Sequence, residues 1–178
     1  LVVPVCLAPP VLDLSTLDGT NGFVLDGVDP YDASGYSVSS AGDFNGDGFD
    51  DLIIGAVDAD QPGAAGAGES YLVFGSDSFS AVVDLAALNG TNGFALEGIA
   101  AGDRSGYVVS AAGDVNGDGF GDLFIGAPYA DPAGHGHSLA AGRQDLVEIF
   151  QRDAADHKGR QAHLAGYLPD EIEAGEGG

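Results

Sequence analysis

The chain has 178 residues, the length of one ordinary domain, and 44% of them are hydrophobic, which is enough to form a core. Its charge is unusual, because 28 Asp and Glu residues stand against 5 Lys and Arg, a formal net charge of -23. A surface this acidic repels nucleic acid and anionic membranes, so neither is an expected partner. Bound cations would offset the self-repulsion, and the acidic surface of a halophilic protein is the alternative explanation.

Residues 1–12 form an apolar segment that contains three prolines. The segment is too short to cross a bilayer and lacks the basic start of a signal peptide, so no membrane insertion is expected from it. Cys6 is the only cysteine. An intramolecular disulfide is therefore excluded, and cysteine usage does not indicate a redox compartment.

An internal repeat with an offset of 71 residues begins at Asp13. Residues 13–60 align with residues 84–131 without a gap, and 31 of these 48 positions are identical. Such matching indicates one supersecondary unit that is used twice. We divide the chain into the N-terminal segment 1–12, repeat 1 at 13–83, repeat 2 at 84–152, which diverges after residue 131, and a C-terminal tail at 153–178.

Short runs of β-branched and aromatic residues, bounded by Gly and Asp, predict strands in both repeats. The run Leu52–Ile54 is apolar on both faces, which in an antiparallel sheet is typical of a strand between two neighbouring layers. We therefore expect an all-β fold of two four-stranded antiparallel propeller-type blades, a partial β-propeller, with an irregular C-terminal segment. The predicted strands lie at residues 22–25, 36–41, 51–56, 70–75, 93–97, 107–112 and 122–127. Residues 146–150 are interpreted as a degraded further strand, and a short helix over residues 145–155 is the alternative.

Each repeat contains an acidic, glycine-rich loop with oxygen-bearing side chains at positions 1, 3, 5 and 9. Calcium takes roughly six to eight oxygen ligands, and Asn-Gly and Asp-Gly pairs let a loop turn tightly around an ion. The pattern predicts about two Ca²⁺ sites, each in a loop that joins two antiparallel strands. The predicted ligands are the side chains of Asp43, Asn45, Asp47 and Asp51 with the Phe49 carbonyl, and those of Asp114, Asn116, Asp118 and Asp122 with the Phe120 carbonyl.

Two other kinds of loop have similar residues. An EF-hand needs an acidic ligand at position 12 and flanking helices, but position 12 is Ile54 or Ile125 within a predicted strand. The EF-hand interpretation is therefore rejected. A polar hairpin turn without an ion is the remaining alternative, because Asp, Asn and Gly dominate turns in any case.

The repeat resembles the FG-GAP repeat of integrin alpha subunits and of many bacterial surface proteins. The resemblance is carried by the acidic loops and by Gly35–Val38, Gly55–Ala56, Tyr71–Gly75 and Gly126–Pro128. It implies calcium-binding propeller blades of an extracellular or cell-surface protein that acts in adhesion, assembly or ligand binding. It also leaves two alternatives: non-catalytic accessory blades of a secreted hydrolase, and a structural filament subunit.

Two repeats are too few to close a propeller of about four to eight blades. The expected partners are therefore other propeller blades or a second copy of the chain, together with a protein or glycan ligand. No Ser, Cys or His stands in a recognisable nucleophile motif, so we do not expect the protein to be an enzyme. The pair His135 and His137 is interpreted as part of a solvated glycine-rich loop rather than as a metal site.

Overall fold

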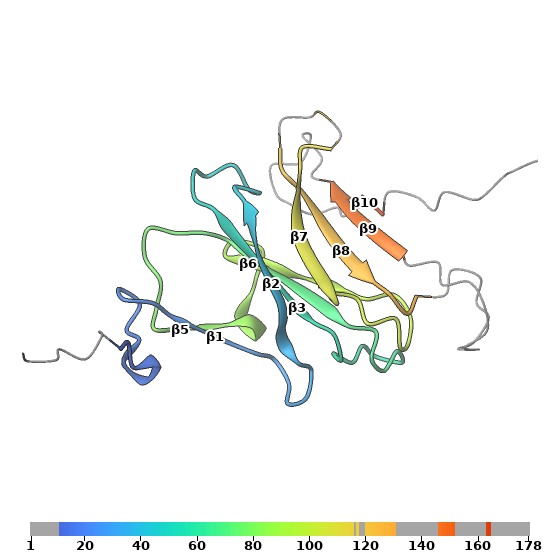
Figure 1. The fold of residues 1–178 in the computed structure, drawn as a ribbon, viewed down its shortest axis with the longest axis horizontal. Helices are drawn as coiled ribbons and strands as arrows, with labels where there is room; N and C mark the ends of the chain where they lie inside the picture. Colours follow the sequence, from blue (N-terminus) through green and yellow to red (C-terminus); the bar gives the residue numbers. More distant parts are fainter. Residues whose placement is uncertain (1–10, 116, 118–119, 131–145, 152–162, 165–178) are drawn as a thin grey trace, which may run out of the picture.

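The fold was taken from a computed structural model that describes residues 11–115, 117, 120–130, 146–151 and 163–164. Two four-stranded sheets and one two-stranded sheet contain all the strands of these residues (Figure 1). Helical structure in the described part is limited to two short 3-10 turns, η1 (Leu14–Thr16) and η2 (Leu85–Ala87). The prediction of a mostly β fold is confirmed.

The first sheet has the strand order β2-β3-β4-β6, and each neighbouring pair is antiparallel. Three of these strands come from repeat 1, but the outermost strand comes from the start of repeat 2. The sequence repeat and the structural sheet are therefore out of phase by one strand. The bounds are β2 (Ser34–Gly42), β3 (Asp51–Ala56), β4 (Glu69–Val73) and β6 (Gly93–Glu97).

The second sheet has the order β7-β8-β9-β10, again antiparallel throughout. Its outermost strand, β10, falls in the segment where the sequence predicted a tail without strands. His163 and Leu164 stand 71 residues after Asn92 and Gly93, at the edge of β6, so β10 takes the place of β6 in the second sheet. The bounds are β7 (Val108–Gly113), β8 (Asp122–Ala127), β9 (Leu146–Gln151) and β10 (His163–Leu164).

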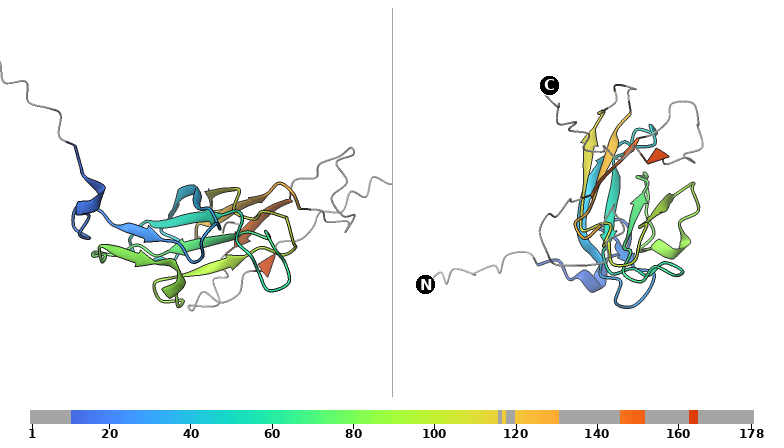
Figure 2. Two further views of the ribbon diagram at one scale, coloured as in Figure 1. Left: turned by 90° about the horizontal axis from the view of Figure 1, so that it is seen from below. Right: turned by 90° about the vertical axis from the view of Figure 1, so that its right-hand side faces the viewer.

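The third sheet pairs β1 (Val24–Asp26) with β5 (Val82–Asp84) in parallel. The sequence analysis predicted a strand over residues 22–25, which overlaps β1, but it predicted none at β5. The pairing joins Val24 to Val82, which lie far apart in the chain, so only the tertiary fold creates this strand. The pair lies at the end of the molecule opposite β8 and β9 (Figures 1 and 2).

Two apolar clusters hold these layers together. The cluster between the two large sheets includes Ile53 and Leu72 of the first sheet and Leu123 and Ile125 of the second, all four fully buried. The strand β7 lies against β2 and β3 at this interface (Figure 1). The second cluster lies on the other face of the first sheet, where η2 and the β1–β5 pair cover it; its members are Ile54, Ala56, Ala59, Tyr71, Val73 and Leu85, with partly buried Leu25, Leu52, Phe79, Val83 and Leu88.

The two large sheets approach each other closely at two glycines, Gly55 and Gly106. A Cβ atom added to Gly55 of β3 would collide with the carbonyl oxygen of Gly106, just before β7. A Cβ atom on Gly106 would lie 2.9 Å from Ser70 Oγ and 3.1 Å from the Cα atom of Gly55. Backbone therefore meets backbone at this point, and no larger residue fits without moving the sheets apart.

We predict that Gly55→Ala destabilises the protein, because the added methyl group overpacks a rigid contact. Overpacking of a well-packed interior typically costs about 1–3 kcal/mol. The measurement is the midpoint of urea unfolding at low protein concentration.

Gly126→Ala is the matched control for this prediction, since Gly126 is the residue equivalent to Gly55 in repeat 2. Its added Cβ would meet Val108 at distances of 3.6 Å and more, which is ordinary van der Waals contact. The control should leave the midpoint almost unchanged. Equal midpoints for wild type and Gly55→Ala would show that the close contact contributes nothing.

Candidate metal centre

The first acidic loop connects β2 to β3, so it joins two antiparallel strands as the sequence predicted. No helix flanks it. The loop curls around the carboxylate of Asp43, which accepts N–H bonds from Gly46 at 2.8 Å and Asp47 at 2.9 Å on Oδ1, and from Gly48 at 3.0 Å on Oδ2. The Asp43 side chain therefore points into its own loop. Gly46 and Gly48 both have a positive φ, which permits this tight path.

Asn45 and Asp47 stand side by side within the same loop. The side-chain oxygen of Asn45 accepts the N–H of Asp47 at 2.8 Å, and the side-chain amide of Asn45 donates to Asp47 Oδ2 at 2.8 Å. Asp47 Oδ1 accepts the N–H of Phe49 at 2.9 Å. These local bonds follow from the turn chemistry of Asx residues, and they hold the side chains at positions 1, 3 and 5 in one small region.

Asp51, at position 9, is fully buried at the base of the loop. Its Oδ2 atom accepts N–H bonds from Phe44 at 2.8 Å and Asn45 at 3.3 Å, and its Oδ1 atom accepts the N–H of Gly75 at 2.8 Å. Burial raises the pKa of Asp51, the hydrogen bonds from these three N–H groups oppose the shift, and the charge of Asp47 adds to it. This carboxylate ties the loop to the end of β4.

The second loop repeats this arrangement wherever it is described. Asp114 Oδ1 accepts the N–H of Gly117 at 2.7 Å, as Asp43 accepts that of Gly46. Asp122 is fully buried, and its Oδ2 atom accepts the N–H of Val115 at 2.7 Å. Its Oδ1 atom has no hydrogen-bond partner in the described part of the chain. The predicted ligands Asn116 and Asp118 lie outside the described residues.

The donors of the first loop suit a hard cation. Asp43, Asn45 and Asp47 offer carboxylate and amide oxygens within a few residues of one another, and such oxygens are the ligands of calcium. Three acidic, histidine or cysteine side chains do not converge as a preformed metal cluster anywhere in the described residues. Further oxygens would therefore come from the Asn45 amide, a backbone carbonyl such as that of Phe49, or water.

A second acidic group lies near the opposite end of the first sheet and was missed by the sequence reasoning. Asp32 is buried, and its pKa is raised by burial and then by the negative charges of Asp29, Glu69 and Asp60. These residues come from distant parts of repeat 1, so no local pattern reveals the group. Gln61 and Tyr71 both donate hydrogen bonds to the Glu69 carboxylate.

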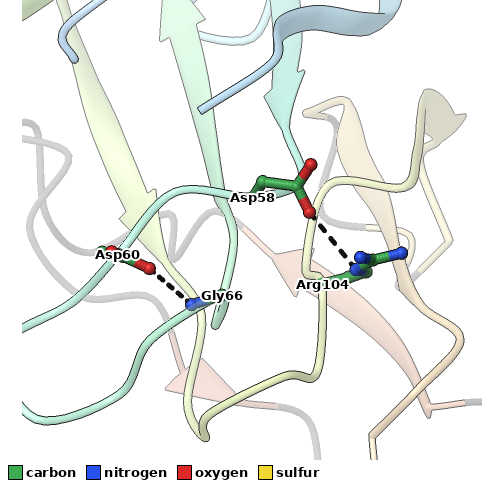
Figure 3. A network of polar contacts seen from close by, with 4 residues as sticks. All are labelled: Asp58, Asp60, Gly66 and Arg104. Atoms are coloured by element: carbon green, nitrogen blue, oxygen red, sulfur yellow. Dashed lines mark hydrogen bonds and ion pairs between the residues drawn. The ribbon is translucent and has the colours of Figure 1, made fainter. Parts of the chain in front are cut away.

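Arg104, the one Lys or Arg within the described residues, lies next to this acidic end. Its Nε atom is 3.3 Å from Asp58 Oδ1, while Asp60 accepts the N–H of Gly66 at 2.7 Å (Figure 3). The Arg104 guanidinium also lies 5.2 Å from the centre of the Tyr129 ring. Because both charged side chains of the ion pair are about half exposed, the pair contributes little to stability.

Tyr36 and Tyr107 occupy equivalent positions in the two repeats. Their ring centres lie 5.0 Å apart, so the two rings contact each other. Tyr36 lies near the start of β2, and Tyr107 directly precedes β7. Tyr36 nevertheless remains 53% exposed. The two tyrosines therefore link the sheets at the surface and are not core residues.

These features define a class: a β repeat protein whose sheets carry acidic, glycine-rich hairpin loops. The model of the FG-GAP repeat matches the chain twice, over residues 34–73 and 105–145. The chain therefore carries two FG-GAP repeats, and their resemblance to those of integrin alpha subunits is confirmed by the relatives described next.

Several curated proteins are similar to the repeat region. Phosphatidylinositol-glycan-specific phospholipase D of Bos taurus is 38% identical over 99 residues, which cover 56% of this chain and 11% of that protein. Integrin alpha-PS2 of Drosophila melanogaster is 35% identical over 106 residues, covering 57% of this chain and 7% of the relative. Integrin alpha-5 of Xenopus laevis is 36% identical over 106 residues, covering 57% and 9%. The chain thus matches about a tenth of the length of these relatives.

Among the described residues, no helix has the length and apolar character needed to span a membrane.

We predict that Asp51→Asn destabilises the protein in the presence of a chelator. An amide offers one acceptor oxygen where the carboxylate offers two, so the N–H of Gly75 or those of Phe44 and Asn45 would face an NH₂ group. A buried donor without a partner costs about 1–3 kcal/mol. The measurement is the free energy of unfolding. Asp50→Asn, at the exposed neighbouring residue, is the control for the loss of one charge.

We predict that Asp32→Asn stabilises the protein at neutral pH. A carboxyl whose pKa is raised in the folded state holds its proton more tightly there, so its ionisation above that pKa lowers stability. The stability gained by Asp32→Asn should shrink as the pH falls through the raised pKa of Asp32. It should vanish below the ordinary pKa of 3.8. The measurement is the melting temperature of wild type and Asp32→Asn as a function of pH, in the presence of a chelator.

Asp77→Asn is the matched control for this test, because it removes one negative charge at an exposed position. A gain as large for Asp77→Asn as for Asp32→Asn would assign the effect to net charge alone.

Proposed function

We propose that the chain is a calcium-binding FG-GAP repeat module of an extracellular or cell-surface protein, acting in adhesion, assembly or ligand binding. The single observation that carries the proposal is the inward-turned Asp43 carboxylate, which three N–H groups of its own loop surround next to Asn45 and Asp47. Turn chemistry accounts for the N–H bonds, but the closeness of Asp47 to the buried Asp51 is unfavourable without a cation, because the charge of Asp47 raises the pKa of Asp51.

The proposed ligands of the first site are Asp43, Asn45, Asp47, Asp51 and the carbonyl of Phe49. Those of the second site are Asp114, Asn116, Asp118, Asp122 and the carbonyl of Phe120. A bound calcium ion would supply two positive charges to the clustered carboxylates. The protein's own part is to hold those side chains by backbone N–H bonds and to anchor the loop through the buried Asp51.

The two large sheets are proposed to be four-stranded propeller-type blades. Support comes from the strand order, in which each repeat supplies three strands to one large sheet and the first strand of repeat 2, β6, completes the sheet of repeat 1. It also comes from packing on both faces of β3, with Ile53 in one cluster and Ile54 in the other. A blade that lies between neighbours has this pattern.

A location outside the cell fits the chemistry of the loops. Extracellular calcium modules bind the ion at roughly 0.1–1 mM, a concentration found outside cells and not in the cytosol. Relatives named integrin alpha and phospholipase D share this repeat, and the shared region is a small part of each. Proposed partners are therefore other blades and a protein or glycan ligand, and no catalytic role is proposed for the repeats.

The second candidate is a set of accessory blades that serves a hydrolase. It is favoured by the 38% identity to phosphatidylinositol-glycan-specific phospholipase D over 99 residues. A screen of the chain for phosphodiester hydrolysis with and without calcium discriminates between the two. Activity of the chain itself would contradict the non-catalytic assignment. The third candidate, a filament subunit, would show elongation when calcium is added.

We predict that calcium titrated into chelator-treated protein binds at two sites and raises the melting temperature. At about ten times the dissociation constant each site would stabilise the fold by about 1.4 kcal/mol. For a chain of this size the two sites together would raise the melting temperature by roughly 5–10 °C. Titration calorimetry and thermal unfolding are the measurements.

Asp47→Ala should remove one site and Asp118→Ala the other, so the double variant should lose both the heat of binding and the thermal shift. Asp50→Ala is the matched control, because position 8 is acidic only in the first loop and is Gly121 in the second. Unchanged binding in the double variant would refute the calcium proposal.

A further inference from the structure

The turn between η2 and β6 carries the tripeptide Asn89-Gly90-Thr91, which plays no part in the proposed calcium sites. Asparagine followed two residues later by Ser or Thr is the acceptor sequence for N-linked oligosaccharides, provided that the middle residue is not proline. The chain has five asparagines, and Asn89 is the one that meets this condition. The equivalent turn of repeat 1 begins with Asp18, so it lacks the acceptor amide and serves as an internal comparison.

The two equivalent turns have the same hydrogen bonds around their first side chain. Asn89 Oδ1 accepts the N–H of Thr91 at 3.0 Å and the Thr91 hydroxyl at 2.6 Å. Asp18 Oδ1 accepts the same two groups of Thr20, at 2.9 Å and 2.7 Å. Since Asp18 forms this turn with a carboxylate, the turn does not require an amide nitrogen at position 89.

The amide nitrogen of Asn89 differs from those of the other described asparagines. The amide nitrogens of Asn21, Asn45 and Asn92 donate hydrogen bonds to oxygens within their own loops, at 3.0, 2.8 and 3.3 Å. In the part of the chain that the structure describes, no hydrogen bond engages Asn89 Nδ2, because the contacts of this side chain are made by its oxygen. The nitrogen that would carry a sugar is therefore available.

The turn of repeat 2 also has room at its tip. Asn89, Gly90 and Thr91 are all exposed. A Cβ atom added to Gly90 would meet no described atom within 4 Å, whereas one added to Gly19, the equivalent glycine, would collide with the carbonyl oxygen of Phe79. The turn of repeat 1 thus packs against its own repeat, and the turn of repeat 2 faces open space. An oligosaccharide is bulky and needs such a surface position.

The turn lies at the end of the first sheet that carries the first acidic loop. The carbonyl oxygen of Asn92 accepts the N–H of Phe74 at 3.0 Å, and the next residue, Gly75, donates to Asp51 at the base of that loop. A sugar on this turn would leave the opposite end of the sheet, around Asp32, uncovered.

We propose that Asn89 is an acceptor site for an N-linked oligosaccharide. Asn89 Nδ2 attacks the anomeric carbon of an oligosaccharide that is carried on a lipid diphosphate, in a reaction catalysed by a transferase of the secretory pathway. A carbon–nitrogen bond forms and the bond from the anomeric carbon to the diphosphate oxygen breaks. The lipid diphosphate leaves with the electron pair, and Nδ2 gives up one proton. The inference rests on the proposed location outside the cell, since the donor is met on the way there, and it does not depend on calcium.

The test is secretion of the intact chain from a eukaryotic host, followed by an amidase that releases N-linked sugars. This enzyme hydrolyses the modified amide and leaves aspartate at position 89, so peptide mass spectrometry locates the site. We expect a glycosylated wild type whose mass falls on treatment. Asn89→Gln and Thr91→Ala should abolish the modification. Thr91→Ser should retain it, because serine also supplies the hydroxyl group.

Asn21→Gln is the matched control, since Asn21 lies in the equivalent turn but is followed two positions later by Phe23. It should keep the sugar. A secreted wild type without sugar, or a sugar that survives Asn89→Gln, would overturn the proposal. Calcium titration of the secreted chain tests the proposed function separately. A glycosylated chain that binds no calcium would support the site at Asn89 and contradict the calcium proposal.

Discussion

The architecture depends on the contact of backbone with backbone where β3 meets the segment leading into β7. Gly55 and Gly106 allow the two large sheets to approach closely enough for Ile53 and Leu72 to interlock with Leu123 and Ile125. A single methyl group at either glycine would separate the sheets and open the cluster that stabilises both of them. Because the same glycines recur in each repeat, one local solution can join many sheets in succession.

The acidic loops are coupled to this packing through a buried carboxylate. Asp51 accepts N–H groups from the loop on one oxygen and from Gly75 at the end of β4 on the other. The conformation of the loop is therefore tied to the alignment of two core strands. An ion that ordered the loop would also stabilise the sheet, so the proposed calcium ion would act on the structure as well as neutralise charge.

The distribution of charge separates the two ends of the first sheet. One end carries the loop around Asp43, whose acidic side chains accept the N–H groups of their own turn. The other end carries Asp32 and its acidic neighbours, where burial and mutual repulsion oppose ionisation. Arg104 is the one Lys or Arg of the described residues, so it balances very little of this charge. Cations from solution would reduce the repulsion at the two ends.

The sequence by itself determined the features whose cause is local. The 71-residue repeat, most strands and the hairpin position of the acidic loops follow from residues close in the chain, because turn chemistry and side-chain alternation act over a few residues. Only the tertiary structure decided that β6 completes the first sheet, that β5 forms at all, and that Asp32 is buried. It also decided that Val109 is buried while its equivalent Val38 is exposed. Both valines belong to nearly identical segments, and they differ only in whether another sheet packs on them, which no local pattern encodes.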